Sequence, residues 1–229
     1  MKRFWKTATV DGADDGWTIA LDGRRVKTPA RVDLIVPTRV LADAIATEWN
    51  DVGEEIDPRA MPLTGLANAA IDRVAANPKR FADDLAKYGE GDLLCYRADG
   101  PEALVARQAE QWGPLLDWAR RRYDVDFRIG EGVLHIPQPE GTVERLAHAV
   151  AALDPFRLAG LSPMVTIGGS LVTALAVIEG DVSPDRGWAA VSLDDRWQIE
   201  QWGADADAVK ALENRERDFL AAACFLSLL

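Results

Sequence analysis

Cysteine and histidine are scarce in this chain, which has two of each among 229 residues. Neither cysteine belongs to a CxxC pair, and two cysteines cannot form a zinc site unless histidines join them. His135 and His148 each stand alone, and we expect surface or satisfied core positions for them rather than ligand roles. The sequence therefore predicts no metal and no cofactor, and it favours two buried free thiols, Cys95 and Cys224, over a disulfide.

Excess positive charge is also missing. The chain carries 26 Lys and Arg residues against 37 Asp and Glu residues, a formal net charge of −11 at pH 7. Such a chain repels nucleic acid and anionic membranes, and no basic stripe offsets that repulsion. An acidic surface suits a basic protein partner, although it also serves solubility alone. We therefore expect no nucleic-acid ligand.

Long hydrophobic runs are a third thing that the sequence lacks. The most apolar stretch, residues 163–178, contains Gly168-Gly169-Ser170 and is too short to span a bilayer. The first residues are basic but run into polar ones, without the apolar segment that a signal peptide needs. We therefore expect a cytoplasmic protein with no insertion into a membrane.

The composition that remains is that of an ordinary globular protein, with 48% hydrophobic and 28% charged residues. Short runs with alternating or β-branched residues, separated by turn residues, fill the first part of the chain. Asp22-Gly23 joins two of them with the signal of a type I′ hairpin. We predict strands at Phe4–Val10, Gly16–Leu21, Arg24–Lys27 and Asp33–Val36.

After these runs the hydrophobic periodicity becomes that of helices. Thr38 is placed to cap a helix over residues 39–50, and Asn77 to cap one over residues 78–88 that starts with proline. Further helices are predicted over residues 62–75, 101–123, 142–153, 155–161, 163–180, 184–202 and 207–226. The secondary structure of residues 125–136 is ambiguous in the sequence, and residues 133–136 are a candidate strand.

The predicted fold class is therefore α+β. We expect a small N-terminal antiparallel β domain over residues 1–57 and a larger, mostly α-helical domain over residues 58–229. The boundary is placed by Gly53 and Pro58, which interrupt the pattern between two predicted helices.

Two segments resemble chemical motifs only in part. Residues 88–97 hold Asp92, Cys95 and Arg97, but a catalytic cysteine needs a histidine to lower its pKa, and neither histidine lies in a motif-like setting. We expect Asp92 and Arg97 to form a structural ion pair or helix-end contacts. Gly168-Gly169-Ser170 matches neither a P-loop nor GxGxxG, and we expect its small residues to let a neighbouring helix approach closely.

The most informative stretch is residues 191–207, with two tryptophans, two glutamines and five carboxylates. Trp197 and Trp202 are five positions apart, so on a helix they lie roughly 140° apart and one can be buried while the other is near the surface. Asp194 and Gln198 are four apart and share a face. Aromatic rings beside acids and amides suit recognition of a protein surface.

The carboxylates of this stretch also have a catalytic interpretation. Asp194, Asp195 and Glu200 could act as acid and base only if burial or mutual repulsion moved their pKa values apart, and the sequence indicates neither. A solvated helix face is the usual explanation of such a pattern.

Several motifs in order along the chain resemble those of one known family. They are residues 23–29, Glu48-Trp49, residues 61–64 with Ala67-Asn68 and Asp72-Arg73, residues 92–97, Gln111-Trp112 with Pro114, residues 168–170 with 174–176, and Trp197-Gln198 with residues 200–203. Together they resemble the ATP-twelve family, the assembly chaperones that bind the alpha subunit of the ATP synthase catalytic head. The resemblance runs over nearly the whole chain, and the composition suggests a bacterial member.

The resemblance implies a small β domain, a larger helical domain and no enzymatic activity. It implies a chaperone that holds the free alpha subunit, prevents its aggregation and gives it up when the beta subunit takes its place. The family's functional acid maps to Asp194 or Asp195, which the sequence does not distinguish. We expect a monomer whose partner-binding residues are Asp194, Asp195, Trp197, Gln198, Glu200 and Trp202.

The alternative is a small-molecule enzyme that uses Asp92, Arg97 and the C-terminal carboxylates. It requires a deep pocket in which those polar groups converge with shifted pKa values. A passive scaffold subunit is a third hypothesis, and it would be found as a permanent, stoichiometric part of a purified complex.

Overall fold

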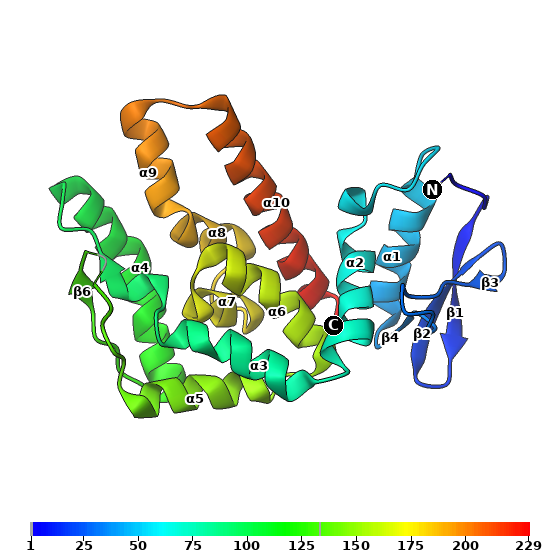
Figure 1. The fold of residues 1–229 in the computed structure, drawn as a ribbon, viewed down its shortest axis with the longest axis horizontal. Helices are drawn as coiled ribbons and strands as arrows, with labels where there is room; N and C mark the ends of the chain where they lie inside the picture. The colour runs from blue at the N-terminus through cyan, green and yellow to red at the C-terminus, as the bar shows by residue number, and fades with distance from the viewer. Residues whose placement is uncertain (1, 133) are drawn as a thin grey trace. The chain divides into compact units, whose positions relative to one another are not determined.

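The computed structural model describes residues 2–132 and 134–229 (Figure 1). The chain divides into two compact units. Unit 1 comprises Met1–Pro78, Asp154–Gly160 and Cys224–Leu229, and unit 2 comprises Lys79–Leu153 and Leu161–Ala223. These units differ in extent from the division at residue 57 predicted above, because Met61, Leu63, Ala67, Phe156 and Phe225 join the hydrophobic core beside the sheet. That division into domains stays a prediction.

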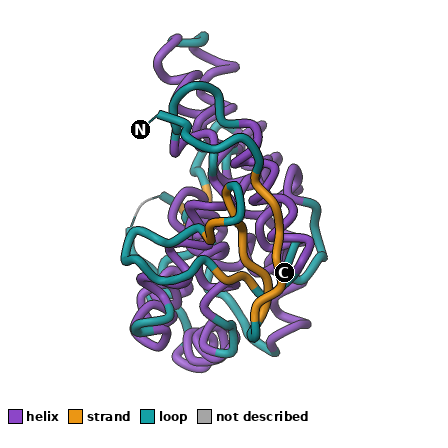
Figure 2. The backbone as a smooth tube through the Cα atoms, turned by 90° about the vertical axis from the view of Figure 1, so that its right-hand side faces the viewer, coloured by secondary structure: helices purple, strands orange, loops and turns teal. Residues whose placement is uncertain are grey.

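Unit 1 contains a small antiparallel sheet, as predicted (Figure 2, orange). Strand β2 (Gly16–Leu21) pairs with β1 (Ala8–Ala13), with β3 (Arg24–Arg25) and with β4 (Ile35–Val36). Asp22 and Gly23 between β2 and β3 have φ values of 48° and 81°. These left-handed conformations are the ones that a type I′ turn needs, so the predicted hairpin is confirmed.

The strand predicted from Phe4 begins only at Ala8. The amides of Lys6 and Thr7 are taken by the Asp22 carboxylate, at donor–acceptor distances between 3.0 and 3.2 Å, and so do not join the ladder. The indole of Trp5 turns to α1 (Arg39–Asp51) and donates to the Trp49 carbonyl at 3.1 Å. Side-chain contacts from elsewhere in the chain thus shorten this strand.

Helix α1 closes the core of unit 1. The Thr38 hydroxyl oxygen accepts from the Leu41 amide at 3.2 Å, which confirms the predicted cap. Leu41, Ala42, Ile45 and Ala46 are buried on one face of the helix. They join the side chains of Ile19, Leu34, Val36, Met61 and Phe225 in one hydrophobic core.

Helix α2 (Pro62–Ala69) receives its cap from α1. The Glu48 carboxylate accepts from the amides of Leu63 and Thr64 at 2.7 and 2.8 Å and from the Thr64 hydroxyl at 2.7 Å. A carboxylate at a helix N-terminus satisfies amides that have no partner within the helix and interacts favourably with the helix dipole. A 3₁₀ turn (Pro58–Ala60) precedes α2, and a π-helical turn (Ala70–Val74) extends it.

The remaining helices belong mostly to unit 2. The short strands β5 (Tyr96–Arg97) and β6 (Gly130–Glu131) pair in parallel, and 3₁₀ turns cover Lys87–Gly89 and Leu93–Cys95. The helices are α3 (Pro78–Ala86), α4 (Glu102–Tyr123), α5 (Glu140–Ala151), α6 (Pro155–Gly168), α7 (Leu171–Ile178), α8 (Pro184–Val191), α9 (Leu193–Trp202) and α10 (Ala206–Ser227).

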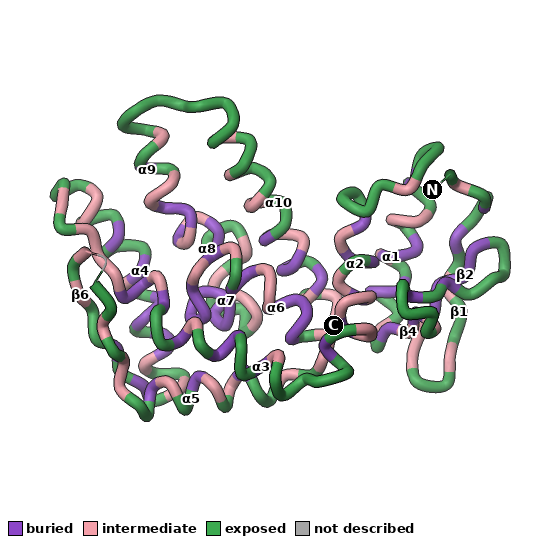
Figure 3. Tube along the Cα trace, viewed as in Figure 1, coloured by how far each residue is buried: buried purple, intermediate pink, exposed green. Residues whose placement is uncertain are grey.

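Helix α7 lies at the centre of unit 2. Its first six residues, Leu171–Ala176, are all buried (Figure 3). It contacts α4 and α8, and these two helices also contact each other. A helix that is apolar all round is stable only when other elements cover it, which is the role of α4 and α8 here.

Three predicted boundaries in the helical part are wrong. Helix α6 continues through Pro163, where a break was predicted, because buried apolar residues on both sides hold it in place. The predicted helix 163–180 is broken instead at Gly169, with φ +67°, and Ser170 caps α7. Residues 184–202 form two helices, because the backbone of Ser192, with φ −97° and ψ 7°, departs from helical geometry.

The predicted packing role of Gly168 is confirmed. A Cβ atom at this position would lie 3.1 Å from the Val191 side chain, so glycine lets α8 approach closely and a larger residue would require Val191 to shift. For the candidate strand at 133–136, Val133 lies outside the described residues and residues 134–136 form no strand. Within the described ranges no helix has both the length and the apolar character needed to cross a membrane.

We predict that Glu48→Ala lowers the free energy of unfolding by about 2 kcal/mol, because it leaves the partly buried amides of Leu63 and Thr64 without their acceptor. Urea unfolding followed by circular dichroism measures the change. Glu54→Ala, at an exposed position of the same unit, is the matched control. An equal effect of both substitutions would show that the Glu48 contacts contribute no stability.

Candidate functional site

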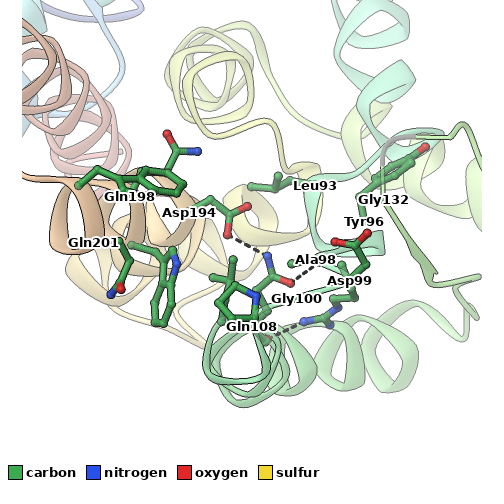
Figure 4. Close-up of a pocket in the computed structure, with 15 residues that line it drawn as sticks. Leu93, Tyr96, Ala98, Asp99, Gly100, Gln108, Gly132, Asp194, Gln198 and Gln201 are labelled. Atoms are coloured by element: carbon green, nitrogen blue, oxygen red, sulfur yellow. Dashed lines mark hydrogen bonds between the residues drawn. The ribbon is translucent and has the colours of Figure 1, made fainter.

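A hollow of about 660 Å³ lies beside α9 in unit 2 (Figure 4). One wall is α9, which supplies Asp194, Trp197, Gln198, Gln201 and Trp202. The opposite wall is the segment from β5 to the first turns of α4. The hollow is of the size that receives large side chains or small ligands.

Gln108 of α4 ties the two walls together. Its side-chain amide donates to Asp194 Oδ1 at 2.8 Å, and its Oε1 atom accepts from the Ala98 amide at 2.8 Å (Figure 4). Its backbone carbonyl accepts from the Arg97 guanidinium at 2.5 Å. Gln108 is 1% exposed, so these contacts are shielded from water. The bonds hold Asp194 in a fixed orientation at the edge of the hollow.

Sequence reasoning missed Gln108, although a signal was available. Leu104, Trp112 and Leu115 form an apolar stripe on α4, and Gln108 lies in line with them. A polar side chain on the buried stripe of a helix requires a hydrogen-bond partner, because leaving it unpaired is costly.

The two tryptophans of α9 differ in exposure as predicted. Trp197 is 8% exposed and Trp202 is 77% exposed. The Arg107 guanidinium carbon lies 4.7 Å from the centroid of the Trp197 ring, and Arg107 also pairs with Glu200 at 2.6 Å. This ion pair is half-exposed, so it adds little stability. Trp202 is therefore the aromatic ring that is available to a partner.

The two adjacent aspartates face different neighbours. Asp194 lines the large hollow with Trp197, Gln198 and Trp202. Asp195 pairs with Arg215 of α10 at 2.8 Å and lines a second hollow of about 200 Å³. Of the six predicted partner-binding residues, the large hollow brings together four; Asp195 and Glu200 lie outside it.

Asp92 has a structural position. Its carboxylate is fully buried and accepts from the Leu94 amide at 3.1 Å and from the Val172 amide at 2.9 Å. These are helix-end contacts, one of the two alternatives predicted; no ion pair with Arg97 forms. The Arg97 guanidinium lies over the Trp112 ring, 4.9 Å from its centroid. Burial raises the pKa of Asp92 to about 6.

The cysteines and histidines show no arrangement for chemistry. Burial, helped by the nearby Asp92 charge, raises the pKa of Cys95 to about 12, so the thiol stays protonated near neutral pH. Cys224 is also a free thiol but is exposed, contrary to the expected burial. His135 Nδ1 lies 3.4 Å from the Tyr96 hydroxyl oxygen, and His148 Nδ1 lies 2.9 Å from the Glu144 carbonyl oxygen. In the described part of the chain no group of three or more acidic, His or Cys side chains is placed to hold a metal.

Comparison with known proteins gives consistent matches. The family model described as ATP12 chaperone protein matches residues 2–120. The mitochondrial protein atp12 of Schizosaccharomyces pombe is 24% identical over 238 residues, which cover 99% of this chain and 82% of the relative.

Solved bacterial structures match the whole fold. The crystal structure of Atp12 from Paracoccus denitrificans has a TM-score of 0.94 and 43% identity, covering 99% of this chain and 97% of that one. An aspartate-to-lysine mutant of the P. denitrificans protein matches with the same TM-score of 0.94. A putative chaperone from Agrobacterium tumefaciens also has a TM-score of 0.94, with 39% identity over 99% of this chain and 85% of that one.

We predict that Asp92 makes stability depend on pH. Its pKa is raised from 3.8 to about 6 in the folded state, so between these values the native state binds more protons than the unfolded state. The contribution of Asp92 to stability is therefore fully present below about pH 4 and is lost as pH rises through about 6. Relative to Asp92→Asn, the wild-type free energy of unfolding should fall by roughly 3 kcal/mol across this window.

Urea unfolding at a series of pH values measures this difference, and comparison of the two proteins cancels the titration of other carboxylates. Asp181→Asn, at an exposed position, is the control and should follow the wild-type profile. Parallel profiles for wild type and Asp92→Asn would contradict the prediction.

Proposed function

The chain belongs to the ATP12 chaperone family, and we propose that it binds the free alpha subunit of the ATP synthase F1 sector and prevents its aggregation until the beta subunit replaces it. At the level of the family, the chain is a chaperone of ATP synthase assembly. The choice of alpha among the F1 subunits is the proposal.

The observation that supports binding most directly is the hollow beside α9 with Trp202 exposed at its edge. Large aromatic side chains supply much of the energy of protein–protein contacts, and they do so best at concave sites that exclude water. A tryptophan that is 77% exposed in the isolated chain loses that exposure when a partner covers it. The hollow thus offers a contact that is favourable only in the complex.

The polar groups around the hollow suit a temporary complex. Gln198 and Gln201 are exposed beside Trp202, and Asp194 is half-buried. An apolar centre with a polar edge is the arrangement of non-obligate interfaces, which are stable enough to exclude water and weak enough to separate. A subunit that must later be handed to beta needs such an interface.

The enzymatic alternative has less support. It needs Asp92, Arg97 and the C-terminal carboxylates to converge on one pocket. Arg97 and Asp194 line the hollow, but the carboxylate of Asp92 is fully buried and accepts from backbone amides. We therefore propose that the chain acts by binding alone.

The proposal also covers the oligomeric state of the chaperone and the compartment in which it acts. We propose that it works as a monomer in the bacterial cytoplasm. Multi-angle light scattering should then give a mass near 25.0 kDa for the isolated chain.

We predict that the chain suppresses aggregation of the purified alpha subunit at an aggregating temperature when the two are mixed near one to one, without nucleotide. Static light scattering measures the suppression, with an unrelated acidic protein as control, because negative charge alone could disperse a basic partner. Addition of the beta subunit should then displace the chaperone from alpha. Absence of both suppression and co-elution would end the proposal.

We predict that reversing both charges at Asp194 and Asp195 to lysine removes most of this protection, with at least about tenfold weaker binding of alpha. The matched control is the same double reversal at Asp83 and Asp84. These are also adjacent aspartates on a helix of unit 2, and each has an ion-pair partner, as Asp195 does. If the Asp194/Asp195 variant folds and still protects alpha fully, the binding site lies elsewhere.

A further inference from the structure

We infer that the hollow beside α9 receives an apolar side chain of the partner while Asp194 pairs with a lysine or arginine next to that side chain. The inference rests on the proposed function, since the partner is the alpha subunit, and it adds the chemistry of the segment that is bound. It also assigns different roles to Asp194 and Asp195.

The walls of the hollow fit an apolar side chain. Leu93, Pro101, Leu104 and Trp197 line it, and the exposed ring of Trp202 stands at its edge. A volume of about 660 Å³ is ample for one large aliphatic or aromatic side chain with part of its backbone. Such a side chain would bury its own surface and that of Trp202 together, which is favourable in proportion to the area removed from water.

The charges around the hollow favour a cation. Its charged lining residues are Arg97, Asp99 and Asp194. The Arg97 guanidinium donates to the neutral Gln108 carbonyl and lies over the Trp112 ring, and its positive charge attracts Asp194 without forming an ion pair. Asp99 is exposed, and no hydrogen bond or ion pair of its side chain is found within the described residues. Two carboxylates against one guanidinium therefore leave the lining of the hollow with an excess of negative charge.

The neighbouring charges do not change this balance. Arg107 pairs with Glu200 at 2.6 Å, and Arg215 pairs with Asp195 at 2.8 Å, so each of these cations is matched by its own carboxylate. A lysine or arginine of the partner would meet this excess of negative charge at Asp194. Such complementarity sets both the rate of encounter and the choice of partner.

Asp194 has acceptor capacity to spare and is held in place. A carboxylate can accept about four hydrogen bonds, and the protein supplies one, from Gln108 to Oδ1. Because buried Gln108 is itself fixed by the Ala98 amide, the Asp194 side chain is oriented before a partner arrives. Binding then does not have to order this side chain, and more of the interaction energy remains as affinity.

Four single variants test the inference. Asp194→Asn removes the charge but keeps an oxygen that can accept from Gln108, and Leu104→Trp fills the hollow. Asp83→Asn and Leu153→Trp are the matched controls, because Asp83 pairs with Lys79 on another helix of unit 2 and Leu153 lines a separate hollow of that unit. Thermal unfolding of each variant checks that it is folded.

Isothermal titration of the purified alpha subunit into each protein measures the affinity. We expect Asp194→Asn and Leu104→Trp each to weaken binding about tenfold and both controls to bind like wild type. Asp194→Asn should also reduce the dependence of the association rate on salt, because salt screens the attraction that the lost charge provided.

The results of these titrations distinguish failure of the inference from failure of the proposed function. If wild type does not bind alpha, the proposed function fails, and the inference fails with it. If wild type binds but either Asp194→Asn or Leu104→Trp keeps full affinity, only the inference is overturned. Self-association of the wild type that Leu104→Trp abolishes would mean that the hollow receives a second copy of this chain, which also overturns the inference.

A cross-linking experiment identifies the segment bound. Benzoylphenylalanine in place of Gln201, which lines the hollow, should cross-link to an alpha segment in which an apolar side chain adjoins a lysine or arginine. Changing that cation to glutamate should weaken binding to wild type, and Asp194→Lys in the chaperone should restore it. Failure of this charge exchange to restore affinity would show that Asp194 does not pair with the cation.

Discussion

The arrangement of unit 2 depends on satisfying the N-terminal amides of a buried helix. Helix α7 begins in the interior, where water cannot reach its first N–H groups. The Asp92 carboxylate accepts from the Val172 amide, and the buried Ser170 hydroxyl accepts from the Thr173 amide. Burial of the Asp92 carboxylate is unfavourable, and this cost raises the pKa of Asp92. Helix α7, which Asp92 caps, forms the centre around which α4 and α8 pack.

The packing of helices in unit 2 positions the candidate site. Trp112 of α4 donates to the Ala190 carbonyl of α8 at 2.8 Å, which fixes these two helices to each other. Ser192 then ends α8 and directs the chain into α9. One wall of the hollow is thus carried by α4, which contacts α7, and the other by α9, which contacts α4 and α8. A binding surface built on packed helices keeps its shape without a partner, which favours rapid and reversible docking.

Local signals in the sequence predicted those features that a few neighbouring residues determine. The Thr38 cap, the Asp22-Gly23 turn and the contrast between Trp197 and Trp202 all follow from spacing within one element. The contacts that define the hollow join distant parts of the chain, so no local pattern reveals them. Gln108 meets Asp194 across 86 positions, and Asp92 meets Val172 across 80. The motif resemblance identified the family because it draws on the order of motifs along the whole chain.

Unit 1 combines residues from both ends of the chain, which has a consequence for synthesis of the protein. Phe225 is fully buried in the core beside the sheet, where it stacks with Phe156, and the Thr38 hydroxyl donates to the Leu228 carbonyl. The β1–β2 hairpin and α1 emerge early from the ribosome, but their core lacks these side chains until translation has reached the far end of α10. During translation the first strands therefore have apolar surface exposed, so this chaperone of ATP synthase assembly passes through an aggregation-prone stage of its own.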